Sequence, residues 1–413
     1  MNVFDKIFRG DRTIWCIFIA LCVISLLEVF SASSTIVYRQ QSHWGPVLRH
    51  AVFLLIGFGS VMFLQRVQTR YLSALLLVLP ISWLLLVVTM FIGDDVNGAQ
   101  RWLGIGAFTI QPSEFAKLAL VGFVAFFLSK LKNDNESFIF KMLMAGILIT
   151  CGLIVTENLS TACLLFVVCY LMMFIGQISM KKLGLIALSG IVAGVLLFGT
   201  LTLIPDSVAK DYLPDRFATW KARIDRHSSQ GEETSSGAPT AEYKITDENY
   251  QVSHAKIAIA NGNIIGLPGS GTERDFLPQA YSDFIFAIIL EEMGLIGGLI
   301  TLLLYVALMV RAGMLASKTE KLFPRFLLLG CSLIITVQAL ANMAVAVNLI
   351  PVTGQPLPLI SRGGTSTIIT CVYFGIMLAC SNAKEDVHEP VDESIANIDF
   401  SNPESVYPET ETV

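Results

Sequence analysis

Long apolar stretches dominate this chain and constrain its fold more than any other feature. Runs of roughly 17 or more apolar residues recur about ten times between Thr13 and Cys380, and each is long enough to cross the ~30 Å hydrocarbon core of a bilayer. The composition agrees, since 54% of the residues are hydrophobic and only 15% are charged. A soluble enzyme, a secreted disulfide-rich scaffold and a nucleic-acid-binding protein are therefore excluded.

The sequence predicts an all-α, polytopic membrane helix bundle with about ten transmembrane helices and a large extracytoplasmic loop. All eight cysteines fall in the apolar stretches at no metal-ligand spacing, so they are expected to be packing residues. The first apolar run lacks a cleavage site and is expected to remain as a signal anchor. The predicted spans are 13–33, 48–65, 72–92, 112–131, 138–156, 160–178, 182–204, 284–311, 323–350 and 358–380.

Lysine and arginine are distributed unequally between the two sides of this predicted bundle. With the N-terminus in the cytoplasm, fifteen of them lie on the cytoplasmic side. The short loops and helix ends of the other side carry four, namely Arg39, Arg49, Arg101 and Arg362, and the one long loop is exempt from this count. The positive-inside rule therefore predicts that both termini are cytoplasmic and that the loop 205–283 is extracytoplasmic. The sequence therefore predicts two parts: a transmembrane domain over 1–381 and a disordered acidic cytoplasmic tail over 382–413.

The large loop changes composition halfway along. Residues 227–249 are polar and rich in Ser, Thr and Glu, and they cannot bury enough apolar surface to fold by themselves. Residues 250–283 regain isoleucine and alanine and are punctuated by glycine. The first part is expected to be mobile and the second to pack against the mouth of the bundle.

Charged side chains gather near the outer ends of the predicted helices, where burial in lipid is costly unless they are paired or functional. In the run QPSEFAKL, Pro112 suits a first helical turn, and Glu114 and Lys117 are three residues apart on one helix face. Either they form a structural ion pair, or Lys117 attracts a phosphate group with the help of Arg101.

Two further segments combine structural and chemical possibilities. Asp283 stands at the start of the eighth predicted span. Either Ser282 or Asp283 is an ordinary helix N-cap there, or Asp283 is a partly desolvated base that accepts a proton from a hydroxyl. Glu291 and Glu292 follow deeper in that span and are interpreted as internal partners rather than catalytic groups. The run NLIPVTGQPLPLISRGGTS, with Ser361, Gly363 and Gly364, forms either a backbone corner for a lipid headgroup or a tight helix connection.

Four motifs give the chain a resemblance to a known family. They are FSAS at 30–33, NGAQRWLGIGAFTIQPSEFAKL, FLPQAYSDFIFAIILEEMG and NLIPVTGQPLPLIS followed by a Gly-Gly pair. The chain resembles the SEDS (shape, elongation, division and sporulation) family of multi-span peptidoglycan glycosyltransferases, and is more similar to its division branch, FtsW. Family members often have tyrosine where this chain has Arg362.

The resemblance implies polymerisation of lipid II, an undecaprenyl-diphosphate-linked disaccharide pentapeptide, at the outer face of the bacterial cytoplasmic membrane. It implies Asp283 as the essential catalytic acid, and Arg101, Trp102, Glu114 and Lys117 as family site residues. It also implies a class B penicillin-binding protein transpeptidase as partner, with other division proteins, and no nucleic acid. Arg216 or a divalent cation, Mg²⁺ or Mn²⁺, is considered as additional support for the leaving phosphates, with no metal-ligand residues assigned.

Two other functions fit parts of the sequence. A lipid II flippase would use the same cavity, but it needs polar groups down to the inner leaflet, where the sequence offers only Glu28, Glu291 and Glu292. A division scaffold would act mainly through the acidic tail. The glycosyltransferase is the favoured prediction.

Overall fold

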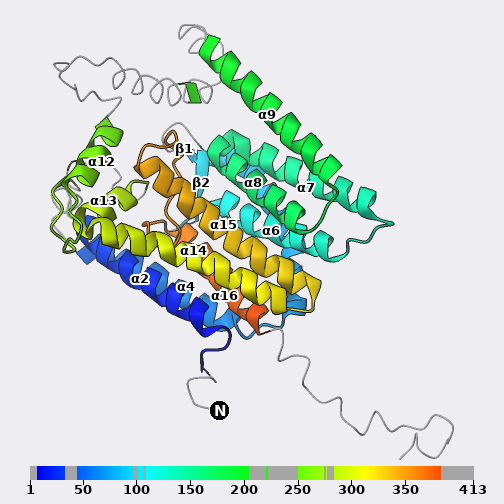
Figure 1. Ribbon diagram of the computed structural model, residues 1–413, viewed down its shortest axis with the longest axis horizontal. Helices are drawn as coiled ribbons and strands as arrows, with labels where there is room; N and C mark the ends of the chain where they lie inside the picture. The colour runs from blue at the N-terminus through cyan, green and yellow to red at the C-terminus, as the bar shows by residue number, and fades with distance from the viewer. Residues whose placement is uncertain are drawn as a thin grey trace, which may run out of the picture.

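The computed structural model describes residues 7–32, 44–95, 100–105, 108–203, 220–221, 250–273, 276 and 283–382. The polar segment 227–249, Arg216 and the acidic tail from residue 383 onward lie outside the described residues, so the expectations about them stay predictions. Within the described ranges the chain is a bundle of long helices that lie side by side (Figure 1), which confirms the predicted fold class.

The elements follow one another along the chain with few non-helical connections. The helices are α2 (Arg12–Ala32), α4 (Trp44–Leu64), the 3-10 helix η1 (Thr69–Ala74), α5 (Leu75–Ile92), α6 (Pro112–Ser129), α7 (Glu136–Glu157), α8 (Leu159–Ile175), α9 (Met180–Leu203), α12 (Tyr250–Asn261), α13 (Ile285–Glu292), α14 (Gly294–Lys318), α15 (Leu322–Ala346) and α16 (Thr365–Ser381). The strands are β1 (Asp94–Asp95), β2 (Gln100–Ile105) and β3 (Phe108–Ile110).

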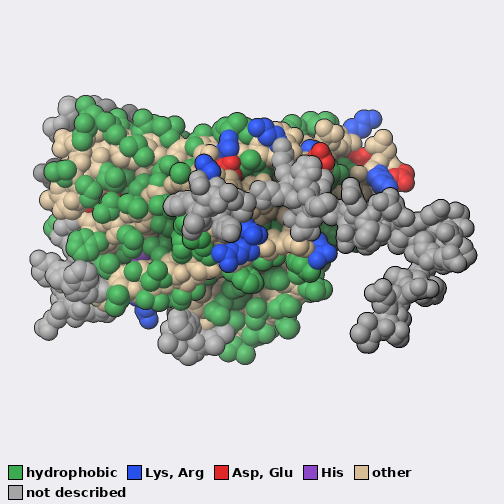
Figure 2. Space-filling view, turned by 90° about the horizontal axis from the view of Figure 1, so that it is seen from below, with side chains coloured by type: hydrophobic (Ala, Val, Ile, Leu, Met, Phe, Trp, Pro, Cys, Tyr) green, Lys and Arg blue, Asp and Glu red, His purple; other side chains and the backbone are tan. Residues whose placement is uncertain are grey.

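Most of these helices are built to cross a membrane. Among the described residues, seven helical segments are long and apolar enough to do so: α2, α4, η1 with α5, α6, α7, α14 and α15. Two shorter apolar helices, α8 and α16, have 17 residues each, or about 26 Å of helix. Apolar side chains cover most of the face shown in Figure 2, as the surface of a multi-pass membrane protein requires.

The interior of the bundle is formed by α6, α15 and α16. In α6 and α15, 72% of the apolar window is buried, against 22% in α4 and in the η1–α5 segment. α15 packs against α6, α8, α14 and α16, and α16 packs closely on α4. Polar side chains carried on α6 and α15 therefore face protein rather than lipid, and these two helices can hold a site.

The eighth predicted span is interrupted. It forms the short helix α13 and the long helix α14, with Met293 between them and Gly294 at φ +72°. A Cβ on Gly294 would lie 2.5 Å from the carbonyl oxygen of Asn263, so the break lets the loop before α13 approach the backbone closely. Hydropathy extends the span through this point because both helices are apolar.

The last span also begins later than predicted, at Thr365 instead of residue 358. Residues 351–364 form a turn-rich connection in which the Ser361 amide donates to the Leu357 carbonyl, and Leu359 and Gly364 have positive φ values of 68° and 49°. The prolines at 356 and 358 disfavour helix in the residues before them. Leu357, Ile360 and Ser361 of this connection are buried.

A small antiparallel sheet was not predicted. It has the strand order β1-β2-β3, and Gly104 of β2 pairs with Thr109 of β3. The strands connect α5 to α6 and lie towards the same end of the bundle as α12 and α13 (Figure 1). We call the end at which β2, β3 and the first residues of α4 and α16 meet the hairpin end.

Candidate functional site

Glu114 and Lys117 form a buried ion pair in the first turns of α6. Pro112 is the first residue of the helix, Glu114 lies in its first turn, and Lys117 Nζ is 2.8 Å from Glu114 Oε1. Lys117 is only 1% exposed, and its Nζ also donates to Gln338 Oε1 of α15 at 3.2 Å. The predicted pairing on one helix face is confirmed, and the pair is buried between α6 and α15.

The α15 residues Gln338 and Asn342 lie one turn apart and hold the connection that precedes α16. The amide nitrogen of Gln338 donates to the Pro356 carbonyl at 3.0 Å. The amide nitrogen of Asn342 donates to the Gln355 carbonyl at 2.8 Å and to the backbone carbonyl of Asp283 at 2.9 Å. One face of α15 therefore contacts both Lys117 and Asp283, which are far apart in sequence.

Asp283 lies two residues before the short helix α13, and it is not the N-cap. Phe284 occupies that position, and its side chain forms no capping hydrogen bond. The predicted capping role of Asp283 is therefore wrong, and Ser282 lies outside the described residues. The Asp283 side chain is partly exposed.

The glycine-rich loop after α12 packs against α13 through two carboxylates. Glu291 Oε1 accepts hydrogen bonds from the amides of Thr272 and Glu273 at 2.8 and 3.1 Å. Glu292 accepts one from the Gly269 amide at 2.7 Å. These contacts confirm that residues 250–273 pack on the bundle and that Glu291 and Glu292 are internal partners.

The depth predicted for these carboxylates is wrong. Glu292 also accepts a hydrogen bond from Ser31 Oγ at 2.5 Å, next to the last residue of α2, and Glu28 lies one turn earlier and is fully buried. Glu28 and Glu292 therefore lie near the end of α2, and the loop after α12 descends to contact Glu291 and Glu292.

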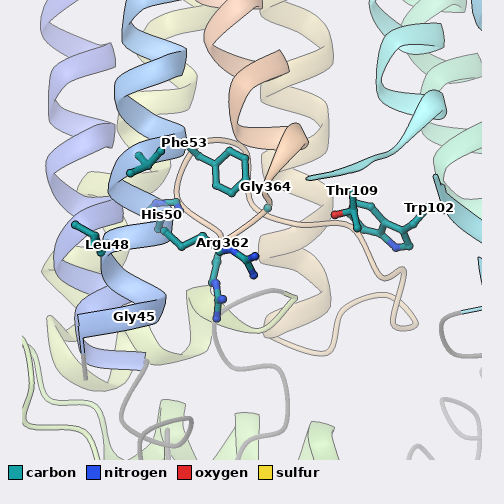
Figure 3. A pocket seen from close by; sticks show the side chains of 11 residues that line it. Gly45, Leu48, His50, Phe53, Trp102, Thr109, Arg362 and Gly364 are labelled. Atoms are coloured by element: carbon teal, nitrogen blue, oxygen red, sulfur yellow. The ribbon is translucent and has the colours of Figure 1, made fainter. Parts of the chain in front are cut away.

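A pocket of roughly 600 Å³ opens at the hairpin end between α4, the strands β2 and β3, and the start of α16. Figure 3 shows Arg362 beside His50, with Trp102 and Thr109 across the opening. Three predicted site residues, Trp102, Gly363 and Gly364, line this pocket. The full lining consists of Gly45, Leu48, Arg49, His50, Val52, Phe53, Trp102, Thr109, Arg362, Gly363 and Gly364.

The structure separates the remaining predicted residues. Arg101 belongs to β2, but its side chain is outside what the structure describes, as is the whole of Arg216. Ser361 is buried, and its hydroxyl accepts a hydrogen bond from the Leu357 amide, so it stabilises the connection. In the described part of the chain no group of three or more His, Cys, Asp or Glu residues is arranged to hold a metal.

Sequence reasoning missed two members of the pocket. Arg49 was counted only as an outer charge, and His50 was assigned no chemistry. Both stand at the first turns of α4, within a span whose apolar pattern gives no sign of a neighbouring pocket. The sequence signal that could have pointed to them is the adjacent Arg and His near a helix end, together with the Gly-Gly pair that lines the same pocket.

The fold and these residues define a class: a multi-pass membrane protein with a polar site at one end of its helix bundle. The family model FTSW_RODA_SPOVE, described as a cell cycle protein, matches residues 11–386. The chain therefore belongs to the FtsW/RodA/SpoVE family, in agreement with the resemblance to SEDS proteins.

Curated relatives cover nearly the whole chain. The chain is 32% identical to stage V sporulation protein E of Bacillus subtilis, over 90% of its length and 96% of that protein's. It is 30% identical to the probable peptidoglycan glycosyltransferase FtsW of Pseudomonas fluorescens, with 87% and 85% covered. The peptidoglycan glycosyltransferase MrdB of Escherichia coli is 29% identical, with 91% and 94% covered.

Solved structures share the fold. One chain from a structure described as "Structural coordination of polymerization and crosslinking by a peptidoglycan synthase complex" aligns with a TM-score of 0.70 at 24% identity, covering 92% of this chain and 99% of that one. The rod shape determining protein RodA of Thermus thermophilus aligns with a TM-score of 0.62 at 22% identity, covering 90% and 97%.

Proposed function

We propose that this protein, a peptidoglycan glycosyltransferase of the FtsW/RodA/SpoVE family, polymerises lipid II into glycan strands with Asp283 as the catalytic acid/base residue. The observation that carries the proposal is the shared contact with α15: Gln338 contacts the buried cation Lys117, and Asn342, one turn further on, contacts Asp283. A base and a cation are thus positioned by one rigid helix.

Sugar transfer from a lipid diphosphate requires these two kinds of group. The Asp283 carboxylate takes the proton of the acceptor sugar's 4-hydroxyl while that oxygen attacks the anomeric carbon of the growing strand. The new C–O bond forms as the bond from the anomeric carbon to the diphosphate breaks, and the departing diphosphate carries its negative charge away. One carboxylate is sufficient for an inverting displacement, whereas a retaining enzyme needs a second one about 5 Å away as nucleophile.

Lys117 supplies positive charge near the leaving phosphates, and Glu114 orients it. Its Nζ reaches Glu114 and Gln338, so its position is fixed before substrate binds. Arg101 would add charge from β2, and Arg216 from the extracytoplasmic loop. A divalent cation fits the site only through Asp283 together with substrate phosphates, in the way that Mg²⁺ commonly binds one carboxylate and phosphate oxygens.

The distribution of buried charge favours polymerisation over flipping. A flippase would need polar groups along the whole path across the membrane. The sequence offers three carboxylates for such a path, Glu28, Glu291 and Glu292. They lie near the end of α2, where Glu292 accepts hydrogen bonds from Ser31 and Gly269. This placement supports a site at one membrane face.

The setting of this activity is part of the proposal. Lysine and arginine at the turns joining α6 to α7, α8 to α9 and α14 to α15 support a cytoplasmic location for the end opposite the hairpin end. The hairpin end would then face outward from the bacterial cytoplasmic membrane. The family description as a cell cycle protein supports a role in cell division. The partner in this proposal is a class B penicillin-binding protein, which would crosslink the strands.

A reconstituted polymerisation assay tests the proposal. Wild type, Asp283→Asn and Asp134→Asn are purified with the partner transpeptidase and supplied with labelled lipid II. Asp134 is an exposed aspartate between α6 and α7 and serves as the matched control. Asp283→Asn is expected to reduce strand synthesis by at least about a hundredfold, the usual contribution of a general base, while Asp134→Asn retains it.

Two results would contradict the proposal. Normal strand synthesis by Asp283→Asn would remove its catalytic role. Transfer of labelled lipid II between leaflets by wild type, without glycan formation, would favour the flippase.

A further inference from the structure

The loop that follows α12 contains an uncharged run whose large side chains are exposed. The sequence IAIANGNIIGLPGSGT over 257–272 has no Asp, Glu, Lys or Arg. Ile264, Ile265 and Leu267 in this run are 71%, 72% and 76% exposed. Neighbouring apolar side chains on the surface of a loop indicate contact with something other than water. We call residues 263–268 the apolar loop.

The backbone of the apolar loop lies against the junction of α13 and α14. The Leu295 amide donates to the Asn263 carbonyl at 2.9 Å, and the next amide of α14 donates to the next carbonyl of the loop at 3.1 Å. These bonds supply acceptors for amides of the first turn of α14. A Cβ on Gly266 would lie only 2.1 Å from the Glu292 carbonyl oxygen. Because the backbone approaches the protein this closely, the large side chains of the loop point away from it.

The length of α14 places the apolar loop within the depth of the hydrocarbon core. Arg311 of α14 pairs with Asp11, just before α2. Because ionised side chains avoid the hydrocarbon, this pair marks the boundary of the core at one membrane face. The sixteen residue steps from Leu295 to Arg311 within α14 correspond to about 24 Å of helix. The core is about 30 Å thick, so Leu295 and the loop residue bonded to it lie inside the opposite boundary.

The helix α2 gives the same depth independently. Its span Arg12–Ser31 has 20 residues, which corresponds to about 30 Å of helix. The Ser31 hydroxyl, at the far limit of this span, donates to Glu292. Glu292 also accepts a hydrogen bond from the Gly269 amide, immediately after the apolar loop, at 2.7 Å. The loop therefore meets the far boundary of the core near Gly269 and lies deeper at Asn263.

The surface beside the apolar loop is one that lipid covers. The helices α13 and α14 both pack on α2, and the start of α14 lies beside α12 and α13 (Figure 1). Only 33% of the apolar window of α14 is buried inside the protein, and Leu295, Leu299 and Ile300 are exposed on this spanning helix. The exposed side chains of the loop continue this lipid-facing surface without a charged residue between them.

We propose that the apolar loop is inserted into the leaflet at the hairpin end of the bundle, where Ile264, Ile265 and Leu267 contact lipid acyl chains. The bilayer, rather than another protein, covers this surface, because the depth of the loop and its continuity with the lipid-facing side of α14 both place it among acyl chains. Irregular backbone is tolerated there because carbonyls of the loop are bonded to α14. The inference depends neither on polymerase activity nor on Asp283.

Photolabelling of the full-length wild-type protein in proteoliposomes tests the inference. The liposomes contain phosphatidylcholine and phosphatidylglycerol, with a small fraction of a phosphatidylcholine that carries a diazirine midway along one acyl chain. After irradiation and digestion with trypsin, mass spectrometry is expected to find lipid adducts on Ile264, Ile265 and Leu267 in the peptide 257–274, as well as on α14. Asp134, which is exposed between α6 and α7, is the control and is expected to stay unlabelled.

A second measurement reports the environment of single positions. A fluorescent amino acid replaces Ile265, Leu267 or, as the control, Asp134, and the variants compared are those that keep the melting temperature of wild type. Emission from positions 265 and 267 is expected to be lost when the bilayer contains lipid brominated on its acyl chains and to be unaffected by iodide in the water. Emission from position 134 is expected to show the reverse.

Three results would overturn the proposal. Quenching by iodide at positions 265 and 267 would place the apolar loop in water. Absence of acyl-chain adducts on the loop of the wild-type protein, while α14 is labelled, would show that lipid does not reach it. Protection of both positions from both quenchers would show that a protein surface, such as a second copy of this chain, covers the loop.

Discussion

Asn342 binds the backbone of Asp283 directly: its side-chain nitrogen lies 2.9 Å from the Asp283 carbonyl oxygen. The same nitrogen donates to the Gln355 carbonyl, so both of its hydrogens are used and both bonds point away from α15. Asn342 Oδ1 is buried and has no partner among the described residues. The residue therefore fixes the carboxylate-bearing segment against α15 and leaves one acceptor for a bound molecule.

Replacing Asn342 by alanine is expected to lower polymerisation mainly through kcat, because Asp283 loses its anchor while the pocket at the start of α16 is unchanged. Two buried carbonyls would also lose a donor, at about 1–3 kcal/mol each. Initial rates over a range of lipid II concentrations, together with melting temperatures in detergent, measure both effects. Ser332→Ala is the control, since its hydroxyl bonds only to Leu329 within α15. A change confined to KM would contradict the positioning role.

The Glu114 and Lys117 pair can be separated into structural and functional parts by a double-mutant cycle. Glu114→Gln and Lys117→Met each leave one buried charge unpaired and are expected to destabilise the protein by about 3–5 kcal/mol. The double variant should recover most of that loss. Melting temperatures and polymerisation rates are measured for all four proteins.

The rates of the double variant decide between the two roles. The double variant is expected to be stable but inactive, because the cation near the leaving phosphates would still be missing. Recovery of both would identify the pair as purely structural.

Gly294→Ala is expected to destabilise the junction of α13 and α14. A positive φ of 72° costs a non-glycine residue about 1–2 kcal/mol, and the added Cβ would overlap the Asn263 carbonyl. Residues 250–273 should become more sensitive to protease, and the melting temperature should fall. Gly313→Ala in the same α14 provides the comparison, because a Cβ there meets nothing within 4 Å. Equal melting temperatures and equal protease sensitivity of the two variants would show that the positive φ at Gly294 is not needed for stability.

Asp11, just before the start of α2, is expected to make a pH-dependent contribution to the stability of the protein. Burial raises the pKa of this carboxyl, but hydrogen bonds from Arg311 and from the amides of Ile14 and Thr13 outweigh burial and hold the pKa below 3.8. The stabilisation is therefore complete well above pH 3.8 and is lost as the pH falls through 3.8 towards the lower folded-state pKa.

The variant Asp11→Asn measures this contribution. It keeps the capping oxygen but removes the charge, so near neutral pH it is expected to be less stable than wild type by up to about 1 kcal/mol. The difference in melting temperature should shrink between pH 5 and pH 3. A constant difference across that range would show that the charge contributes nothing.

Hydropathy predicted the helices well because each span needs only its own residues to be long and apolar. The pairing of Glu114 with Lys117 was equally predictable, since their spacing places them on one face of any helix. Hydropathy was less reliable where the fold interrupts an apolar run. At Gly294 the interruption depends on the approach of the Asn263 carbonyl, which is a contact with another segment.

The sequence by itself determined that this chain is a membrane helix bundle and which side chains are chemically able to act, because burial in lipid makes every charged residue conspicuous. Only the tertiary structure decided their grouping. Lys117 and Asp283 meet through Gln338 and Asn342, and Arg49 and His50 meet Arg362, because helix packing joins residues hundreds of positions apart. Such contacts depend on the register of one helix against another, and no local pattern in the sequence specifies that register.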